Sequence, residues 1–260
     1  VYSFYRFVDI ADIFEIQDIL KQFLQGKDIR GTILIANEGI NGALCGSKND
    51  LNYVIKKIKQ ILTIRKLDLK INESDFFTFN KLKIKTKKEI VTLGKGKLNI
   101  NKFRGNLVNP SEWNELISNK DTIVLDVRNN FEVNIGNFEG SKRLKTNSFR
   151  EFPEAIKKFK LARDSRIAMY CTGGIRCEKA SAYLKSKGYN KVMQLSGGIL
   201  NYLEYIKSKR IQSLWSGECF VFDNRVAINK KLKKGNFIQC YGCRRPIKLS
   251  DTKSKNYIKG

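Results

Sequence analysis

The sequence contains no histidine among its 260 residues. This absence excludes imidazole general bases, imidazole metal ligands and every Ser–His or Cys–His catalytic pair. A nucleophile in this chain must therefore be activated by backbone dipoles, by lysine or arginine, or by a carboxylate. No uninterrupted apolar stretch reaches the length of a membrane-spanning helix. The first residues contain acids and lack a cleavable apolar core, so we expect no signal peptide and a cytoplasmic protein.

Acidic residues are also scarce, because 25 Asp and Glu stand against 50 Lys and Arg and leave a formal net charge of +25. The basic excess is spread along the whole chain. Such a charge favours a polyanionic partner, nucleic acid before a membrane surface. A lysine-rich composition shared by the whole source proteome is the alternative. Six cysteines without regular disulfide spacing indicate a reducing compartment.

Residues 1–90 alternate short apolar strands with two amphipathic helices, predicted over Ile10–Gln25 and Leu51–Leu62. The Asn41-Gly42 pair predicts a tight hairpin turn between two strands. Ser47 is one candidate N-cap of the second helix. The resulting order β-α-β-β-α-β is typical of a ferredoxin-like, or acylphosphatase-like, sandwich.

One strand of this first domain carries lysine at every second position, at Lys81, Lys83, Lys85 and Lys87. Because side chains alternate along a strand, all four ammonium groups would lie on one face. Such a ladder is a candidate contact for tRNA phosphates. The alternative is an edge strand that uses lysine to prevent aggregation.

The rest of the chain divides into a linker, a second domain and a tail. Residues 91–110 are rich in Gly, Lys and Asn and are predicted to be the linker. Residues 111–215 alternate strands with helices, which predicts an α/β domain with a parallel sheet and a site beyond the carboxyl ends of its strands. Residues 216–260 form a short basic C-terminal segment that contains cysteine.

The strongest chemical pattern is the run from Tyr170 to Lys179, YCTGGIRCEK. A buried strand leads into Cys171, a glycine-rich loop follows, and a helix begins near Arg176. Two glycines let several N–H groups converge on the sulfur above the positive end of the helix. These features would lower the thiol pKa without an imidazole. We therefore predict Cys171 as the catalytic residue and the following positions as its loop: Thr172, Gly173, Gly174, Ile175 and Arg176.

The length of this loop argues against phosphoryl chemistry. A cysteine phosphatase has histidine before the cysteine and five residues between cysteine and arginine. Here Tyr170 precedes the cysteine, and four residues separate Cys171 from Arg176. The smaller ring suits a single sulfur or a persulfide better than a tetrahedral phosphate.

These motifs resemble known families. The upstream VLDVRNNFEVNIGNFEGS and the loop with its helix are similar to a rhodanese domain. More narrowly, five fragments occur in the order found in the rhodanese-domain tRNA uridine-34 hydroxylases: GTILIANEGINGALCG, KKEIVTLG, FREFP, YCTGGIRCEKAS and CFVFDNRVA. The resemblance covers nearly the whole chain.

The resemblance implies an oxygen-dependent oxidoreductase that converts the wobble uridine of tRNA to 5-hydroxyuridine. It implies that Cys171 is the active-site residue and forms a persulfide, with molecular oxygen as co-substrate. No cofactor motif, flavin or haem, is evident in the sequence. Two other functions fit the same residues: a sulfurtransferase carrying a persulfide on Cys171, and a non-catalytic basic RNA-binding adaptor. The sequence does not specify an oligomeric state.

The other polar residues near the motif and the other cysteines of the two domains are predicted to have structural roles. Asp126 and Arg128 are predicted to form a charge network around the loop, because a carboxylate beside the thiolate would oppose its ionisation. Cys177 is interpreted as a buried cysteine at the helix start, with resolution of an oxidised Cys171 as the alternative. Cys45 is interpreted as structural.

The C-terminal segment contains Cys219 and the pair Cys240 and Cys243. Three thiols are one ligand short of a closed zinc site, so zinc binding is one interpretation of this segment, and a redox role or no role for the Cys240–Cys243 pair are the alternatives. The resemblance implies a second cysteine pair at about the point where this chain stops, at Gly260, which suggests truncation or divergence. Arg244 and Arg245 are further candidate tRNA contacts.

Overall fold

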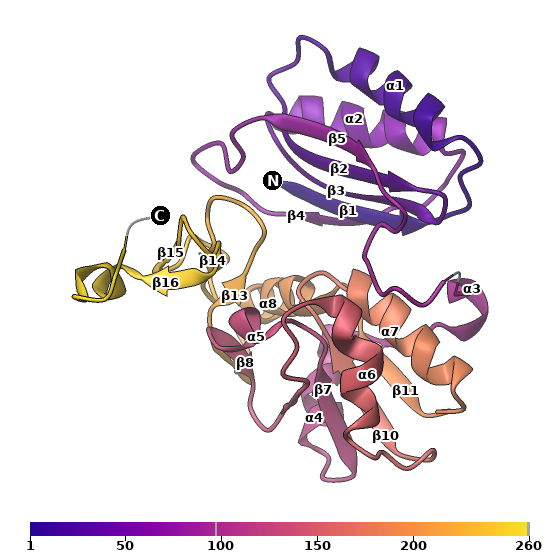
Figure 1. Ribbon diagram of the computed structural model, residues 1–260, viewed down its shortest axis with the longest axis vertical. Helices are drawn as coiled ribbons and strands as arrows, with labels where there is room; N and C mark the ends of the chain where they lie inside the picture. The colour runs from indigo at the N-terminus through magenta and orange to yellow at the C-terminus, as the bar shows by residue number, and fades with distance from the viewer. Residues whose placement is uncertain (97, 259–260) are drawn as a thin grey trace. The chain divides into compact units, whose positions relative to one another are not determined.

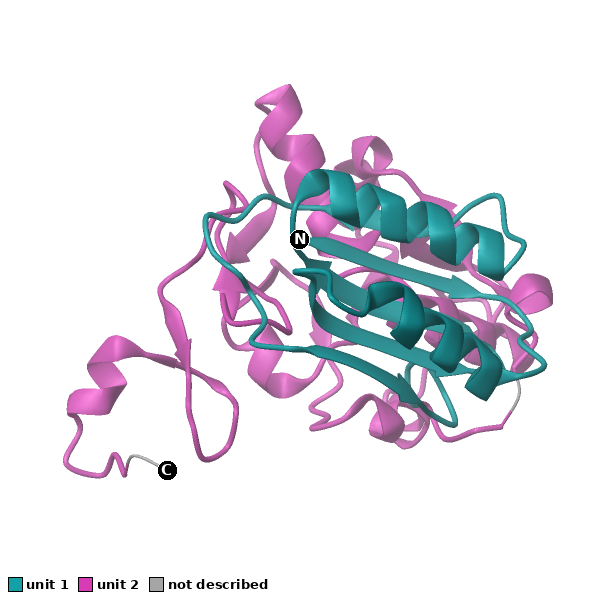
Figure 2. Ribbon diagram, turned by 90° about the horizontal axis from the view of Figure 1, so that it is seen from above, with its two compact units in different colours: residues 1–92 teal, residues 93–260 magenta. Residues whose placement is uncertain are grey.

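The computed structural model describes residues 1–96 and 98–258, and it divides into two compact units. Unit 1 comprises Val1–Thr92, and unit 2 begins at Leu93 (Figure 2). Within the described residues, every helix is too short or too polar to cross a membrane.

Unit 1 is one five-stranded sheet with two helices (Figure 1). The strand order is β4-β1-β3-β2-β5, antiparallel throughout except for the parallel pair of β2 and β5. This is the predicted β-α-β-β-α-β sandwich with β5 added at one edge. Its elements are β1 (Tyr2–Phe7), α1 (Ile13–Leu24), β2 (Arg30–Ala36), β3 (Gly39–Cys45), α2 (Lys48–Ile61), β4 (Asp68–Ile71) and β5 (Leu82–Thr86).

Side-chain caps determine where the two helices begin. Asp12 accepts hydrogen bonds from the N–H groups of Phe14 and Glu15, both at 2.9 Å, so α1 begins at residue 13. Ser47 accepts the N–H of Asp50 at 3.1 Å, which confirms it as the cap of α2. The apolar faces of both helices and one face of the sheet share a single core.

The hairpin turn predicted at Asn41-Gly42 is wrong. The turn that joins β2 to β3 lies at Asn37 and Glu38, and Gly42 is inside β3 opposite Phe4 of β1. A Cβ at Gly42 would lie 2.5 Å from Cζ of Phe4, so the glycine makes room for an aromatic ring. The glycine of the Asn41-Gly42 pair therefore serves cross-strand packing and does not form a turn.

The lysine ladder lies on an edge strand. β5 is the last strand of the sheet, and Lys83 and Lys85 are exposed while Leu82, Ile84 and Thr86 between and beside them are half-buried. The alternation places these lysines on one face, as predicted. The edge position also fits the alternative that lysine protects an open strand edge.

Unit 2 is built on a parallel sheet in the order β6-β11-β10-β7-β9. Helices connect its strands, as the alternating pattern predicted (Figure 1). Its elements up to the last helix are α3 (Ile100–Phe103), β6 (Asn106–Val108), α4 (Pro110–Ser118), β7 (Thr122–Asp126), α5 (Asn130–Val133), β8 (Gly136–Phe138), β9 (Lys142–Arg143), η1 (Phe149–Glu151), α6 (Phe152–Lys157), β10 (Arg166–Tyr170), α7 (Ile175–Ser186), β11 (Val192–Leu195) and α8 (Gly198–Lys209). The elements that follow are β12 (Trp215–Gly217), β13 (Cys219–Phe220), β14 (Ala227–Ile228), β15 (Phe237–Gln239), β16 (Pro246–Lys248) and η2 (Leu249–Lys253).

The boundaries of unit 2 differ from the predicted linker and tail. Within the predicted linker 91–110, α3 forms and β6 pairs with β11 at the edge of the sheet. β6 has only three residues, two of them exposed, so it gave no strand signal. At the other end, β12 pairs with β8, and Cys219, Val221 and Ile228 belong to the main core of unit 2. Leu232 still packs against this core, and Phe237 packs against a smaller cluster beside it, so the predicted tail is part of unit 2 as far as residue 237.

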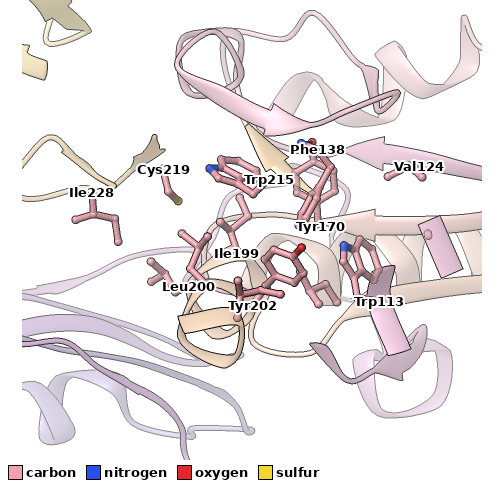
Figure 3. Packing of buried hydrophobic residues seen from close by; sticks show 14 of the residues in the cluster. Trp113, Val124, Phe138, Tyr170, Ile199, Leu200, Tyr202, Trp215, Cys219 and Ile228 are labelled. Atoms are coloured by element: carbon pink, nitrogen blue, oxygen red, sulfur yellow. Dashed lines mark hydrogen bonds between the residues drawn. The ribbon is translucent and has the colours of Figure 1, made fainter. Parts of the chain in front are cut away.

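Aromatic side chains fill this core (Figure 3). Phe138 lies edge-to-face against Tyr170, Tyr202 and Trp215, with ring centroids 4.9, 4.8 and 5.2 Å apart. The Tyr170 hydroxyl also shares a hydrogen bond with Ser141 at 2.8 Å. Because Tyr170 is the last residue of β10, this packing fixes the backbone position from which Cys171 starts.

Candidate active site

Cys171 begins a short loop between β10 and α7 that is held from two sides. Gly174 adopts a φ of +101° and turns the chain into α7. The first residues of α8 hold the loop from the other side: Ile199 N–H donates to the carbonyl of Cys171 at 3.0 Å, and Leu200 N–H to that of Thr172 at 3.1 Å. Gly198 permits this approach, because a Cβ there would lie 2.4 Å from the Cys171 oxygen.

The Cys171 sulfur is fully buried and accepts the N–H of Gly174 at 3.2 Å. Burial alone would raise its pKa. The hydrogen bond from the Cys177 thiol, the Arg176 charge and the N–H groups of Cys177 and Gly174 outweigh that effect and lower the pKa of Cys171 to about 6. The sulfur is therefore anionic at neutral pH without an imidazole.

Cys177 is the donor in this thiol pair. It lies in the first turn of α7 and is fully buried. Burial, and then its hydrogen bond to Cys171, raise the pKa of Cys177 well above the ordinary value for a thiol. The Cys177 thiol thus stays protonated while the Cys171 thiol is deprotonated.

Arg176 is paired with an acid that the sequence did not single out, Glu132 of α5. Nη1 donates to Oε2 at 2.6 Å and Nη2 to Oε1 at 2.7 Å, and Thr172 donates to Oε1 at 3.3 Å. Burial would raise the pKa of Glu132, but the charges of Arg176 and then Arg128 lower it. The same carboxylate accepts the Asn129 N–H at 3.1 Å as part of a capping box, and that Asn-x-x-Glu spacing was the one local signal for it.

Asp126 and Arg128 form the second buried ion pair. Nη2 of Arg128 donates to Oδ2 of Asp126 at 2.6 Å, and Nε donates to Oδ1 at 2.9 Å. Arg128 also donates to the carbonyls of Glu132 and Gly136, at 3.3 and 2.7 Å. The pair therefore ties the end of β7 to α5 and β8.

Both arginines near Cys171 have a carboxylate partner, so neither guanidinium is free to hold a phosphate. This agrees with the loop length in disfavouring phosphatase chemistry.

Among the remaining cysteines, Cys240 shares some of the features that activate Cys171, because the Cys243 N–H, the Cys243 thiol and the Gly242 N–H lower its pKa. Cys45 and Cys219 are buried and in the reduced form. Burial raises the pKa of Cys219 to about 12, so it is an unreactive thiol. Cys240 and Cys243 lie in the turn between β15 and β16, where Cys243 is exposed. Among the residues that the structure describes, no group of three His, Cys, Asp or Glu side chains could hold a metal ion.

The basic candidates occupy different parts of the chain. Lys81, Lys83, Lys85 and Lys87 belong to unit 1, on and beside β5. Arg244 and Arg245 are exposed in the β15–β16 turn, where Arg244 adopts a φ of +61°. The residues directly around Cys171 are instead those of the predicted loop and of the Asp126–Arg128 pair, joined by Glu132 and Cys177.

A further neighbour of the site is Phe222, in the segment between β13 and β14. Its ring centroid lies 5.8 Å from the Cζ atom of Arg176. The fragment CFVFDNRVA contributed to the family resemblance, but sequence reasoning gave Phe222 no role. An exposed aromatic residue 46 positions from Arg176 in the chain offers no local sign of that proximity.

Comparisons with known proteins agree with both units. Residues 1–90 match the family model described as UPF0176 acylphosphatase like domain, and residues 109–205 match the rhodanese-like domain. Among solved structures, a rhodanese-related protein from Thermoplasma volcanium is 31% identical, with a TM-score of 0.32, over 38% of this chain and 92% of its own. A rhodanese-like domain protein from Staphylococcus aureus is 21% identical, with a TM-score of 0.32, over 37% of this chain and 90% of its own.

A curated relative covers the full length of the chain. The tRNA uridine(34) hydroxylase of Pelagibacter ubique (strain HTCC1062) is 48% identical over 261 residues, which span 100% of this chain and 85% of that protein. The identity extends through the acylphosphatase-like and the rhodanese-like parts alike. The chain therefore belongs to the tRNA uridine(34) hydroxylase family.

Proposed function

We propose that this protein hydroxylates the wobble uridine, position 34, of tRNA at carbon C5. The observation that carries the proposal is the 48% identity along the whole chain to a protein of that activity. The geometry supports it, since Cys171 is a thiolate at neutral pH inside a loop built around its sulfur. The excess of basic residues supports a polyanionic substrate.

Cys171 supplies the nucleophile in this proposal. A sulfur that adds to C6 of uracil makes C5 electron-rich, and C5 then reacts with oxygen. In this proposal the Cys171 thiolate first takes the outer sulfur of a thiosulfate-class donor, which leaves as sulfite. The reacting atom is then the outer sulfur of the Cys171 persulfide, which extends one S–S bond of about 2.05 Å beyond the fully buried side chain. Loss of the C5 proton and release of the sulfur from C6 complete the exchange of C5–H for C5–OH.

Molecular oxygen is the oxidant in this proposal. Insertion of one oxygen atom at C5 leaves the second to be reduced to water, which requires two electrons and two protons. A thiol-class reductant balances the reaction by becoming a disulfide. We assign this chemistry to the cytoplasm, where thiols are kept reduced.

The lysine ladder is the proposed tRNA contact of unit 1. Lys83 and Lys85 present two ammonium groups from one face of β5, and Lys81 and Lys87 extend the row. Arg244 and Arg245 are the corresponding proposal for the C-terminal hairpin. Each contact would neutralise one phosphate and add to the salt dependence of binding.

The direct test uses tRNA from a strain that lacks its own uridine-34 hydroxylase. The purified protein, supplied with oxygen, thiosulfate and a thiol, should convert uridine 34 to 5-hydroxyuridine, as measured by mass spectrometry of the nucleosides. Cys171→Ser should abolish the product, while Cys45→Ser, a buried cysteine of unit 1, should leave it unchanged. Failure of the wild-type protein under these conditions would contradict the proposal.

A second experiment tests the sulfur chemistry. tRNA carrying 5-fluorouridine at position 34 should trap a covalent adduct, because fluorine at C5 cannot leave as a proton does. An adduct heavier by one sulfur atom than the protein–RNA sum identifies the persulfide as the nucleophile. An adduct without that sulfur assigns the attack to the Cys171 thiolate itself.

A sulfurtransferase is the second candidate, because a buried thiolate in an amide-lined loop also suits persulfide carriage. Rapid thiosulfate-dependent sulfur transfer, with no hydroxylated uridine, would favour that activity. No hydroxylation by the purified wild-type protein, together with unchanged tRNA modification in cells whose only copy is Cys171→Ser, would instead support the RNA-binding adaptor.

A further inference from the structure

The segment between β13 and β14, residues 221–226, approaches Arg176 of the Cys171 loop through Phe222 and has no part in the chemistry above. Phe220, the last residue of β13, packs edge-to-face on Phe131 of α5 with centroids 5.1 Å apart. Phe131 directly precedes Glu132, the partner of Arg176. Phe222 itself contacts the Arg176 guanidinium. The segment therefore flanks the ion pair next to Cys171.

Phe222 packs against a neighbouring ring although 63% of it is exposed. Its ring lies edge-to-face against Phe220, with centroids 5.0 Å apart and an interplanar angle of 84°. Three rings in a row, Phe131, Phe220 and Phe222, thus lead from buried packing on α5 to solvent. An aromatic ring held in this way exposes a π surface that needs little reordering before a planar ligand stacks on it.

An internal ion pair fixes the segment. Asp223 accepts hydrogen bonds from three nitrogens of Arg225: the backbone N–H at 3.0 Å, Nε at 2.9 Å and Nη2 at 2.6 Å. The same three nitrogens of Arg128 donate to Asp126 at 3.0, 2.9 and 2.6 Å. In both places the Asp-x-Arg pair therefore fixes the local backbone conformation.

Two features of the segment are energetically unfavourable. Val226, a buried β-branched residue, adopts a φ of +63°, which is a strained conformation for its side chain. Nη1 of Arg225 is buried and has no hydrogen-bond partner among the described residues. Strained backbone and unsatisfied polar groups concentrate at functional sites, because a fold retains them only when the resulting geometry is needed. Both features lie within four residues of Phe222.

We infer that Phe222 is the stacking surface for the uracil of position 34 once that base has left the anticodon-loop stack. The inference rests on the proposed function. An enzyme that modifies a base must bring it out of the stack, and aromatic side chains then hold the extruded base. Phe222 is the exposed ring that contacts Arg176, beside Cys171, so a base stacked on it lies next to the reactive sulfur. Phe222 would thus be a substrate-binding residue of this reaction.

The test compares two RNAs with the full-length protein. One is an anticodon stem–loop with uridine at position 34, and the other is the same stem–loop with an abasic site there. Phe222→Ala should weaken binding of the uridine RNA about tenfold and leave binding of the abasic RNA unchanged, because only the first loses a stacked base. Phe222→Trp should retain affinity, whereas Phe222→Leu, apolar but without a π face, should lose most of it.

Phe14→Ala is the matched control, because Phe14 of α1 is also 63% exposed. This variant should bind both RNAs as the wild type does. The alkylation rate of Cys171 should be the same in Phe222→Ala and in the wild type, which shows that the Cys171 loop is intact.

Three results would overturn the inference: equal weakening of both RNAs, wild-type affinity in Phe222→Leu, or a changed Cys171 alkylation rate. Hydroxylation by the wild-type protein is measured in parallel to separate the two proposals. If the wild type hydroxylates uridine 34 while Phe222→Ala binds normally, only the stacking inference fails. If the wild type neither hydroxylates tRNA nor distinguishes the two RNAs, the proposed function fails and the inference fails with it.

Discussion

Glu132 and Arg176 form a bidentate ion pair in the interior of unit 2, with N–O distances of 2.6 and 2.7 Å. Glu132 is fully enclosed and Arg176 nearly so. The pair neutralises a guanidinium that also stabilises the Cys171 thiolate. Glu132 thereby couples the stability of the fold to the ionisation of the sulfur.

Glu132→Gln should reveal this coupling. The variant leaves the Arg176 charge buried without a counter-charge, which should lower the free energy of unfolding by about 3–5 kcal/mol. In the molecules that remain folded, the unopposed charge should lower the pKa of Cys171 further below its value of about 6. Urea unfolding and the pH profile of thiol alkylation measure the two effects.

Glu154→Gln is the control for this variant. Glu154 pairs with Lys157 and Lys95 on the surface, where solvent screens the charges, so its loss should leave stability unchanged. Equal stability of the Glu132 and Glu154 variants would contradict the role given to the buried pair.

The ionisation of Cys171 has a direct kinetic consequence. Because the thiolate is the reactive form, the alkylation rate of Cys171 should rise through a midpoint near pH 6 and level off well below the ordinary thiol pKa of about 9. Iodoacetamide labelling followed by peptide mass spectrometry assigns the rate to Cys171. A midpoint near pH 9 would mean that the loop does not activate the sulfur.

The same shift affects stability, with a definite sign. The unfolded chain holds the Cys171 proton up to about pH 9, while the folded chain releases it near pH 6, so folding is favoured increasingly as the pH rises between these values. The stability advantage of wild type over Cys171→Ser should grow across that window by at most about 4 kcal/mol, and it should disappear as the pH falls through 6. Paired urea titrations at several pH values measure it. A difference that shrinks with rising pH would contradict the assignment.

The Cys171 loop could be predicted from the sequence because its determinants are local. A strand, a cysteine, two glycines and a helix start follow one another without a gap. Glu132 could not be found in that way, because it lies 44 residues from Arg176 and an acid in a short polar helix resembles a surface residue. Only the fold brings α5 against the start of α7.

The fold shows the same division between local and distant information. The order of strands and helices in unit 1 followed from apolar periodicity, and the parallel sheet of unit 2 followed from the alternation of strands and helices. The role of Gly42 did not, because its small size serves Phe4 on another strand. The edge strand β6 was missed because its three residues are too few to show a strand pattern.

Cys177 should act as the hydrogen-bond donor that stabilises the Cys171 thiolate. Cys177→Ala removes the donor, so the pKa of Cys171 should rise by about one to two pKa units, the equivalent of a hydrogen bond to a charged group. Cys177→Ser keeps an O–H donor and should shift the pKa less. The pH profile of alkylation separates the three proteins, with Cys45→Ala as a control for removal of a distant buried thiol. Identical profiles in Cys177→Ala and wild type would show that the backbone N–H groups and Arg176 suffice.

Lys83 and Lys85 should contribute to tRNA affinity in proportion to the phosphates that they neutralise. The double variant Lys83→Ala/Lys85→Ala should weaken tRNA binding and reduce the slope of log K against log salt by roughly 0.7–0.9 for each lysine that contacts a phosphate. Titrations of labelled tRNA at several salt concentrations give that slope. Lys48→Ala/Lys56→Ala removes the same charge from the exposed side of α2 and should leave the slope unchanged. If both double variants reduce the slope equally, the effect belongs to net charge and β5 is only a protected edge.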